Sequence, residues 1–134
     1  MLLVADANIV ISAIIKGSVT QNLLFNPFLE LYSPEFILAE LEEHEEEIRQ
    51  KGGFDEETFQ KIFELVLSRI SLVPEREYAG SLHFAEAICR DPDDIPYVAL
   101  ALALKCPIWT RDKRLFGLAG VQAITTKELV ELFY

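Results

Sequence analysis

Short apolar runs alternate along this chain with longer segments in which apolar residues recur every three or four positions. The short runs predict buried strands at 2–5, 29–32, 70–73, 108–110 and 121–124. The longer segments predict helices at 8–15, 20–25, 34–50, 56–69, 78–89, 95–104 and 126–133. Strands that alternate with helices form parallel sheets with helices on both faces. The pattern therefore predicts an α/β fold around a parallel sheet.

Helix boundaries and buried faces can be placed from the same pattern. Ser33 and Pro34 have the residue types of a helix cap and a first helical position. On the helix that they would begin, His44 falls on the apolar face, and we expect it to be buried. Four aromatic residues fit helical core stripes better than base-stacking positions: Phe59, Phe63, Phe84 and Phe133.

Length and composition predict one domain, residues 1–134, with a substantial core, because 51% of the residues are hydrophobic. Cys89 and Cys106 lack metal-binding spacing, so we expect free thiols in a reducing compartment. The apolar start has no basic leading region and is interrupted by Asp6 and Asn8. No uncharged run reaches the roughly 18 residues of a membrane span. We expect a cytoplasmic protein without a signal peptide or membrane association.

Acidic residues follow two of the predicted strands. Asp6 comes directly after the strand at 2–5, and Asp112 follows the strand at 108–110. Sites in parallel sheets form beyond the carboxyl ends of the strands, so these residues should lie close together. Asp94 precedes the apolar helix at 95–104, and Glu40 lies at the border of the apolar face of its helix.

Carboxylates gathered at one place repel each other, and a divalent cation removes that repulsion. Oxygen ligands suit Mg²⁺ or Mn²⁺, and such an ion activates water for phosphodiester hydrolysis. Each acid also has a simpler interpretation, because Asp6, Asp94 and Asp112 could be caps and Glu40 a solvated glutamate. In the run RDPDD, Asp94 is the first candidate ligand, and Asp91 is the second.

The net charge of −10 argues against broad electrostatic binding of nucleic acid. A nucleic-acid substrate would therefore need a local source of positive charge. Arg111, Lys113 and Arg114 lie beside Asp112 in the sequence and are our candidates for binding an RNA backbone. The alternative is that they are ordinary surface charges.

Four segments, in order, resemble the PIN-domain ribonucleases: VADANIVIS, SPEFILAELEEH, DPDDIPYVALALAL and IWTRDKRL. The resemblance implies a three-layer α/β/α sandwich and an Mg²⁺- or Mn²⁺-dependent endoribonuclease. The residues that match the family's acidic ligands are Asp6, Glu40, Asp94 and Asp112. Asn8 and Thr110 match its supporting polar groups, which hold ligands or water in place.

Many small proteins of that family are toxins of toxin–antitoxin pairs. The resemblance therefore implies an RNA substrate, a small basic antitoxin as partner, and a homodimer. One alternative is a catalytically silent PIN-like binding module in an RNA or protein assembly. Another is a phosphoacceptor or phosphatase-like domain with Asp6 as nucleophile. That chemistry calls for a second acid in a D-x-D motif, where this chain has Asn8.

Overall fold

The computed structural model describes residues 1–15 and 19–134. Its strands form one parallel sheet in the order β3-β2-β1-β4-β5. The strands are β1 (Leu2–Ala5), β2 (Glu30–Pro34), β3 (Ile70–Val73), β4 (Ile108–Trp109) and β5 (Ala123–Ile124). The predicted parallel sheet is confirmed, and β1 lies at its centre.

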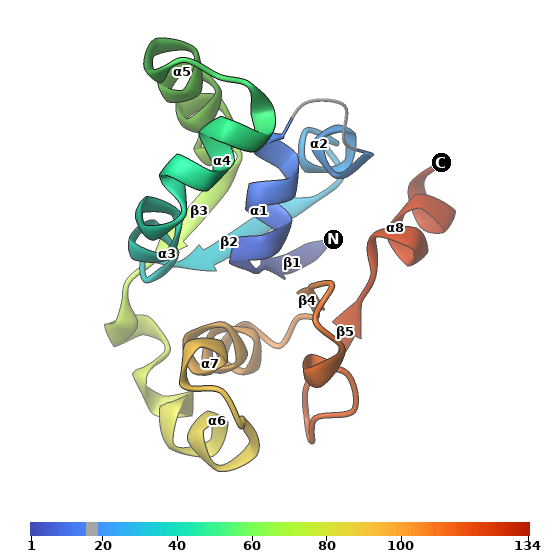
Figure 1. Ribbon diagram of the computed structural model, residues 1–134. Coiled ribbons are helices and arrows are strands. Elements are labelled where there is room, and N and C mark those ends of the chain that lie inside the picture. Colours follow the sequence, from blue (N-terminus) through green and yellow to red (C-terminus); the bar gives the residue numbers. More distant parts are fainter. Residues whose placement is uncertain (16–18) are drawn as a thin grey trace.

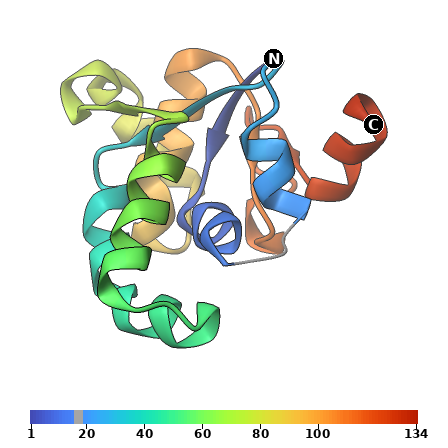
Figure 2. The ribbon, with the colours of Figure 1, turned by 90° about the horizontal axis from the view of Figure 1, so that it is seen from above.

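Helices cover both faces of the sheet, as Figure 1 shows. One face carries α1 (Ala7–Ile14), α2 (Val19–Leu24), α3 (Ile37–Glu43), α4 (Glu45–Gly52) and α5 (Glu56–Leu67). The other face carries α6 (Leu82–Ile88) and α7 (Ile95–Leu104). The last helix, α8 (Thr126–Phe133), lies beyond the edge of the sheet and contacts α2 (Figure 2). This arrangement confirms the three-layer α/β/α sandwich.

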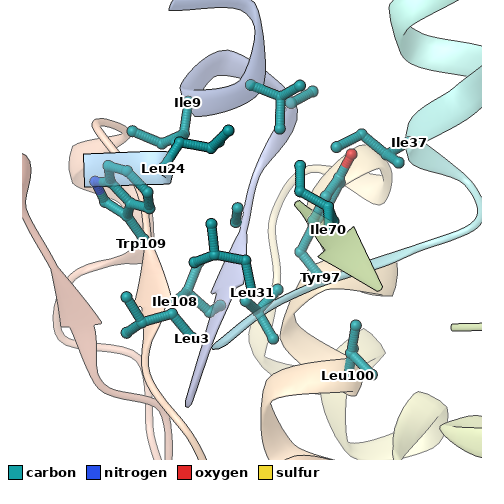
Figure 3. Close-up of a cluster of buried hydrophobic side chains, with 14 of the residues drawn as sticks. Leu3, Ile9, Leu24, Leu31, Ile37, Ile70, Tyr97, Leu100, Ile108 and Trp109 are labelled. Carbon is teal, nitrogen blue, oxygen red and sulfur yellow. The ribbon is translucent and has the colours of Figure 1, made fainter. Parts of the chain in front are cut away.

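The core fills the space between the sheet and its helices, as seen in Figure 3. Leu3, Ile108 and Trp109 of the central strands are fully buried, together with Ile9 of α1. On the opposite face, α7 packs against β1, β2 and β4 and also against α6. Because neighbours surround it, α7 has apolar residues all round, which explains the sequence IPYVALALAL.

The predicted helix start at Ser33 and Pro34 is wrong, because both residues belong to β2. A residue before proline favours extended backbone, and here that preference outweighs the capping preference of serine. Ser33 is fully buried, and its hydroxyl donates to the backbone oxygen of Ala5 at 2.6 Å. This bond fixes the end of β1, directly before Asp6.

The prediction that His44 is buried is also wrong. The expected helix is interrupted at His44, which separates α3 from α4, and its side chain is 46% exposed. The break turns His44 out of the apolar face, and its imidazole lies 3.5 Å from the carboxylate of Glu47. Phe84 is 49% exposed rather than part of the core. The segment before α6 forms two 3₁₀ turns, so that helix begins later than predicted.

Cys89 and Cys106 are free and partly buried, as expected. Burial raises the pKa of each thiol to about 11, so both remain protonated near neutral pH. Within the described residues, every helix is too short or too polar to cross a membrane.

Candidate functional site

The four predicted acids line one cavity of about 200 Å³. Asp6 follows β1, Glu40 lies on α3, Asp94 precedes α7, and Asp112 follows β4. Asn8, Asp91, Asp93 and His44 line the same cavity. The fold therefore gathers side chains from four separate segments at the carboxyl ends of β1 and β4. We call this space the acidic cavity.

Asp6 is the most deeply buried of the four acids, with 7% of the residue exposed. One carboxylate oxygen accepts a hydrogen bond from the Ile9 backbone at 3.0 Å, which caps α1. The other oxygen accepts a hydrogen bond from the hydroxyl of Thr110. Asp6 therefore serves as a helix cap and also faces the cavity, so the two interpretations of this residue do not exclude each other.

Thr110 joins two of the acids. It is fully buried, and its hydroxyl oxygen accepts a hydrogen bond from the backbone N–H of Asp112 at 3.0 Å. The same hydroxyl donates to Asp6. Thr110 thus links Asp6 and Asp112 through one buried hydroxyl. Asn8 is exposed and lines the acidic cavity.

Glu40 is held by a residue that the sequence analysis missed. The hydroxyl of Tyr97 donates a hydrogen bond to the carboxylate of Glu40. Tyr97 is 3% exposed and packs edge-to-face against Phe36 at 6.3 Å between ring centroids. Figure 3 shows its hydroxyl pointing toward Ile37 of α3. Its position three residues after Asp94, on the same helical face, is a signal that could have identified it.

Asp112 is paired with a cation from its own loop. The guanidinium of Arg114 contacts both carboxylate oxygens of Asp112, with its shortest bond at 2.8 Å. A further nitrogen of Arg114 lies 3.4 Å from Asp91. Arg114, predicted to bind RNA, therefore lies within the acidic cavity. The other two candidates, Arg111 and Lys113, are exposed and do not line that cavity.

The three aspartates before α7 differ in their surroundings. Asp94 occupies the cap position of α7 but makes no capping hydrogen bond, so its carboxylate is not used by the helix. Asp91 accepts from the backbone of Asp93 at 2.9 Å. Asp93 is exposed, whereas Asp94 and Asp91 are partly buried. Exposure therefore separates Asp93 from the two candidate ligands.

Burial and mutual repulsion disfavour the charged forms of three of the acids. Desolvation raises the pKa of Asp6 and of Glu40, and neighbouring carboxylates raise both further. Burial, followed by the negative charge of Asp112, raises the pKa of Asp94 to about 6. The pKa of Asp112 itself is lowered by its hydrogen bonds with Arg114. Added positive charge in the cavity would relieve the repulsion at the first three acids.

The donors fit a hard divalent cation, because the acids offer only carboxylate oxygens. As the side chains stand, no three acidic, histidine or cysteine residues within 1–15 and 19–134 are placed to bind a metal ion together. Two of the acids are engaged elsewhere, since Glu40 is bound by Tyr97 and Asp112 by Arg114. Coordination by all four would require Asp112 to turn away from Arg114.

The chain matches the family described as PIN domain over residues 4–133. It is similar to a chain in the crystal structure of VapBC2 from Rickettsia felis bound to a DNA fragment from their promoter. The TM-score is 0.67 at 19% identity, over 93% of this chain and 98% of that one.

A second solved structure with this fold is a toxin-antitoxin complex from Klebsiella pneumoniae. Its TM-score is 0.65 at 18% identity, over 92% of this chain and 97% of the other. No curated protein matches the sequence. At these identities, the two structures show a shared fold.

Proposed function

Because the chain belongs to the PIN domain family, we propose that it is a metal-dependent endoribonuclease, acting as the toxin of a toxin–antitoxin pair. The observation that carries this proposal is the convergence of Asp6, Glu40, Asp94 and Asp112 on one cavity. Four carboxylates from distant segments create a repulsion that costs stability unless a cation balances it. Mg²⁺ or Mn²⁺ bound there would activate water and neutralise charge on a phosphate oxygen.

The residues of the cavity have distinct parts in this proposal. Asp6 and Asp112 would bind the cation from the ends of neighbouring strands, with Thr110 setting the distance between them. Asp94, directly before α7, would be a further ligand, with Asp91 as the alternative in the same loop. Tyr97 would hold Glu40 toward the cavity, because burial and Glu40 keep the pKa of Tyr97 far above its usual range. Its hydroxyl therefore stays protonated and can donate.

A protein antitoxin is supported by the two solved structures, one of VapBC2 and the other of a toxin-antitoxin complex. The net charge of −10 suits a small basic partner that enters the acidic cavity. A homodimer remains part of the proposal. The cellular test is growth arrest on expression of this chain alone, with rescue when the neighbouring reading frame is expressed with it.

The biochemical test is Mn²⁺-dependent cleavage of RNA by the purified protein. We expect cleavage that is abolished by chelation and restored by added Mn²⁺ or Mg²⁺. Asp6→Asn should lower the rate at least a hundredfold, because it removes the central carboxylate but keeps its shape. Glu43→Gln, a change on the same helix as Glu40 but outside the acidic cavity, is the matched control. Equal cleavage by the Asp6 variant and the parent protein would refute the assignment.

A catalytically silent binding module is the second candidate. One observation favours it: Arg114 already neutralises Asp112, and the described side chains do not form a three-residue metal site. Titration calorimetry with Mn²⁺ separates the two functions. A nuclease should bind the ion, and binding should be lost in Asp6→Asn, whereas a silent module should show no heat of binding.

A further inference from the structure

Positive charge in this acidic protein is concentrated around the acidic cavity. Three further cavities adjoin the loop that follows β4, with volumes of about 220, 430 and 400 Å³. Of the eleven lysine and arginine residues within 1–15 and 19–134, six line these three cavities: Lys51, Arg90, Arg111, Lys113, Arg114 and Lys127. The fold therefore supplies locally the positive charge that the overall composition lacks.

The cavity of about 430 Å³ differs from the others in its lining, and we call it the cationic pocket. Its side chains come from the loop after β4 and from the start of α8: Thr110, Arg111, Lys113, Phe116, Thr125, Thr126 and Lys127. Three of them are cationic, three carry hydroxyls, and none of these described lining residues is acidic. Arg111, Lys113 and Lys127 are all exposed. The hydroxyls of Thr110 and Thr125 already donate to Asp6 and Glu128, so the three exposed cations are the groups that suit an anionic ligand, such as a phosphodiester backbone.

Phe116 lies between the cationic pocket and the cavity of about 220 Å³, because it lines both. It is 37% exposed, so part of its ring is open to solvent. The cavity of about 220 Å³ is lined by the apolar residues Ile88, Leu115 and Leu118, with Arg90 among its charged residues. An exposed aromatic ring flanked by cations is the arrangement that binds unstacked bases of single-stranded nucleic acid.

Two of these cavities adjoin the acidic cavity, because they share lining residues with it. The cavity of about 220 Å³ shares Asp94 and Arg114 with the acidic cavity. The cavity of about 400 Å³ shares Asp112 with it and Arg111 with the cationic pocket. An RNA strand with one phosphate in the acidic cavity could therefore run along these shared residues to the cationic pocket.

We propose that Phe116 stacks on a base of single-stranded RNA while Arg111, Lys113 and Lys127 bind the phosphates that flank the cleaved bond. This inference rests on the proposed nuclease function and adds Phe116 and Lys127 as substrate-positioning residues. We expect a duplex to bind less tightly, because its bases are stacked on each other and leave no free face for Phe116.

The structure provides its own reporter for binding. Trp109 is the single tryptophan of the sequence, and its indole N–H donates to the hydroxyl of Thr126 at 3.0 Å. Because Thr126 lines the cationic pocket, occupation of the pocket should change the fluorescence of Trp109. The experiment is a titration of Asp6→Asn protein, which does not cleave, with an oligoadenylate of about ten nucleotides and with a blunt RNA duplex.

We expect the oligoadenylate to bind more tightly than the duplex. Phe116→Leu should weaken its binding about tenfold or more, and Phe116→Tyr should restore it, because only the aromatic ring stacks. Lys127→Gln should weaken binding several-fold and reduce its dependence on salt. Lys61→Gln, which removes an exposed lysine of α5, should leave binding unchanged. Phe116→Leu with unaltered affinity, or Phe116→Tyr as weak as Phe116→Leu, would overturn the proposal.

Two further measurements identify the reason for a negative result. If polyglutamate displaces the oligoadenylate and Phe116→Leu has no effect, the pocket binds acidic polypeptide, and the inference is wrong. Hydrolysis of bis(4-nitrophenyl) phosphate by the wild-type protein with Mn²⁺ tests the metal chemistry without a nucleic-acid strand. If this hydrolysis and RNA cleavage occur but Phe116→Leu and Phe116→Tyr bind the oligoadenylate with equal affinity, the inference fails and the nuclease function stands. If neither reaction occurs, the nuclease function itself fails.

Discussion

The buried hydroxyl of Thr110 donates a hydrogen bond to the carboxylate of Asp6, across 104 positions of sequence. The same oxygen accepts from the backbone of Asp112. One small side chain between the ends of β1 and β4 therefore fixes the two acids that we place closest to the cation. Substitution of Thr110, an uncharged residue, therefore tests how the positions of Asp6 and Asp112 affect binding of the cation.

Replacement of Thr110 by valine should weaken Mn²⁺ binding about tenfold to a hundredfold. Valine keeps the shape but removes the hydrogen bond that lowers the pKa of Asp6, and it leaves the Asp112 N–H without its acceptor. Thr110→Ser keeps the hydroxyl and should bind nearly as well as the wild type. Titration calorimetry measures both variants, and equal affinity for Thr110→Val and wild type would count against the role of this residue.

Replacement of Tyr97 by phenylalanine should shift the pH dependence of RNA cleavage toward higher pH. The Tyr97 hydroxyl lowers the pKa of Glu40, so its removal raises that pKa and protonates more of the carboxylate at a given pH. The loss of rate should be about tenfold near pH 6 and smaller at pH 8. The observable is the acidic limb of the pH–rate profile. A uniform loss at every pH would instead indicate a change in packing.

Replacement of Asp94 by asparagine should stabilise the metal-free protein above pH 6. The folded pKa of Asp94, about 6, exceeds its ordinary value of 3.8, so the folded state binds this proton more tightly than the unfolded state. The free energy of unfolding therefore falls as pH rises from about 4 to 6, and the variant avoids that loss. After allowance for partial exposure, we expect a gain of about 1 kcal/mol at pH 7.5.

The control for Asp94→Asn is thermal denaturation at about pH 2.5, where the variant and the parent should melt alike because Asp94 is protonated in both states. Addition of Mn²⁺ at pH 7.5 should raise the melting temperature of the parent more than that of the variant. Equal stabilisation of both proteins by Mn²⁺ would show that Asp94 does not contact the ion.

Sequence reasoning located the acids of the site but not the interactions that hold them. Asp6 and Asp112 could be found because strand ends of a parallel sheet meet at one edge, and β1 and β4 were predicted within one residue. The ion pair of Arg114 with Asp112 depends on the course of a short loop, which local sequence does not determine. His44 was misplaced because a break between α3 and α4 leaves no proline or glycine as a signal.

The error at Ser33 has a similar origin. Ser-Pro is compatible with a helix start and with the end of a strand, and only the pairing of β2 with β1 and β3 decides between them. By contrast, α7 and α8 were predicted with their observed boundaries, because each begins directly after a capping residue type. In α8, Thr125 and Glu128 form a complete capping box.

Replacement of Arg114 by glutamine should strengthen Mn²⁺ binding several-fold in the absence of RNA. Arg114 competes for Asp112 and also contacts Asp91, so its removal frees carboxylate oxygens and takes away a repelling charge. Arg76→Gln, which changes an exposed arginine in the turn at 75–77, is the matched control. Weaker Mn²⁺ binding by the Arg114 variant would mean that this residue organises the site rather than competes for it.

The central claim is that Asp6, Glu40, Asp94 and Asp112 share one cation site. The most direct measurement is the anomalous difference density of a crystal of the wild-type protein grown with Mn²⁺. The account predicts a peak in the acidic cavity, with oxygens of Asp6, Glu40, Asp94 and Asp112 about 2.1 Å away and Arg114 turned from Asp112. A cavity without a peak, with Arg114 still bound to Asp112, would contradict it.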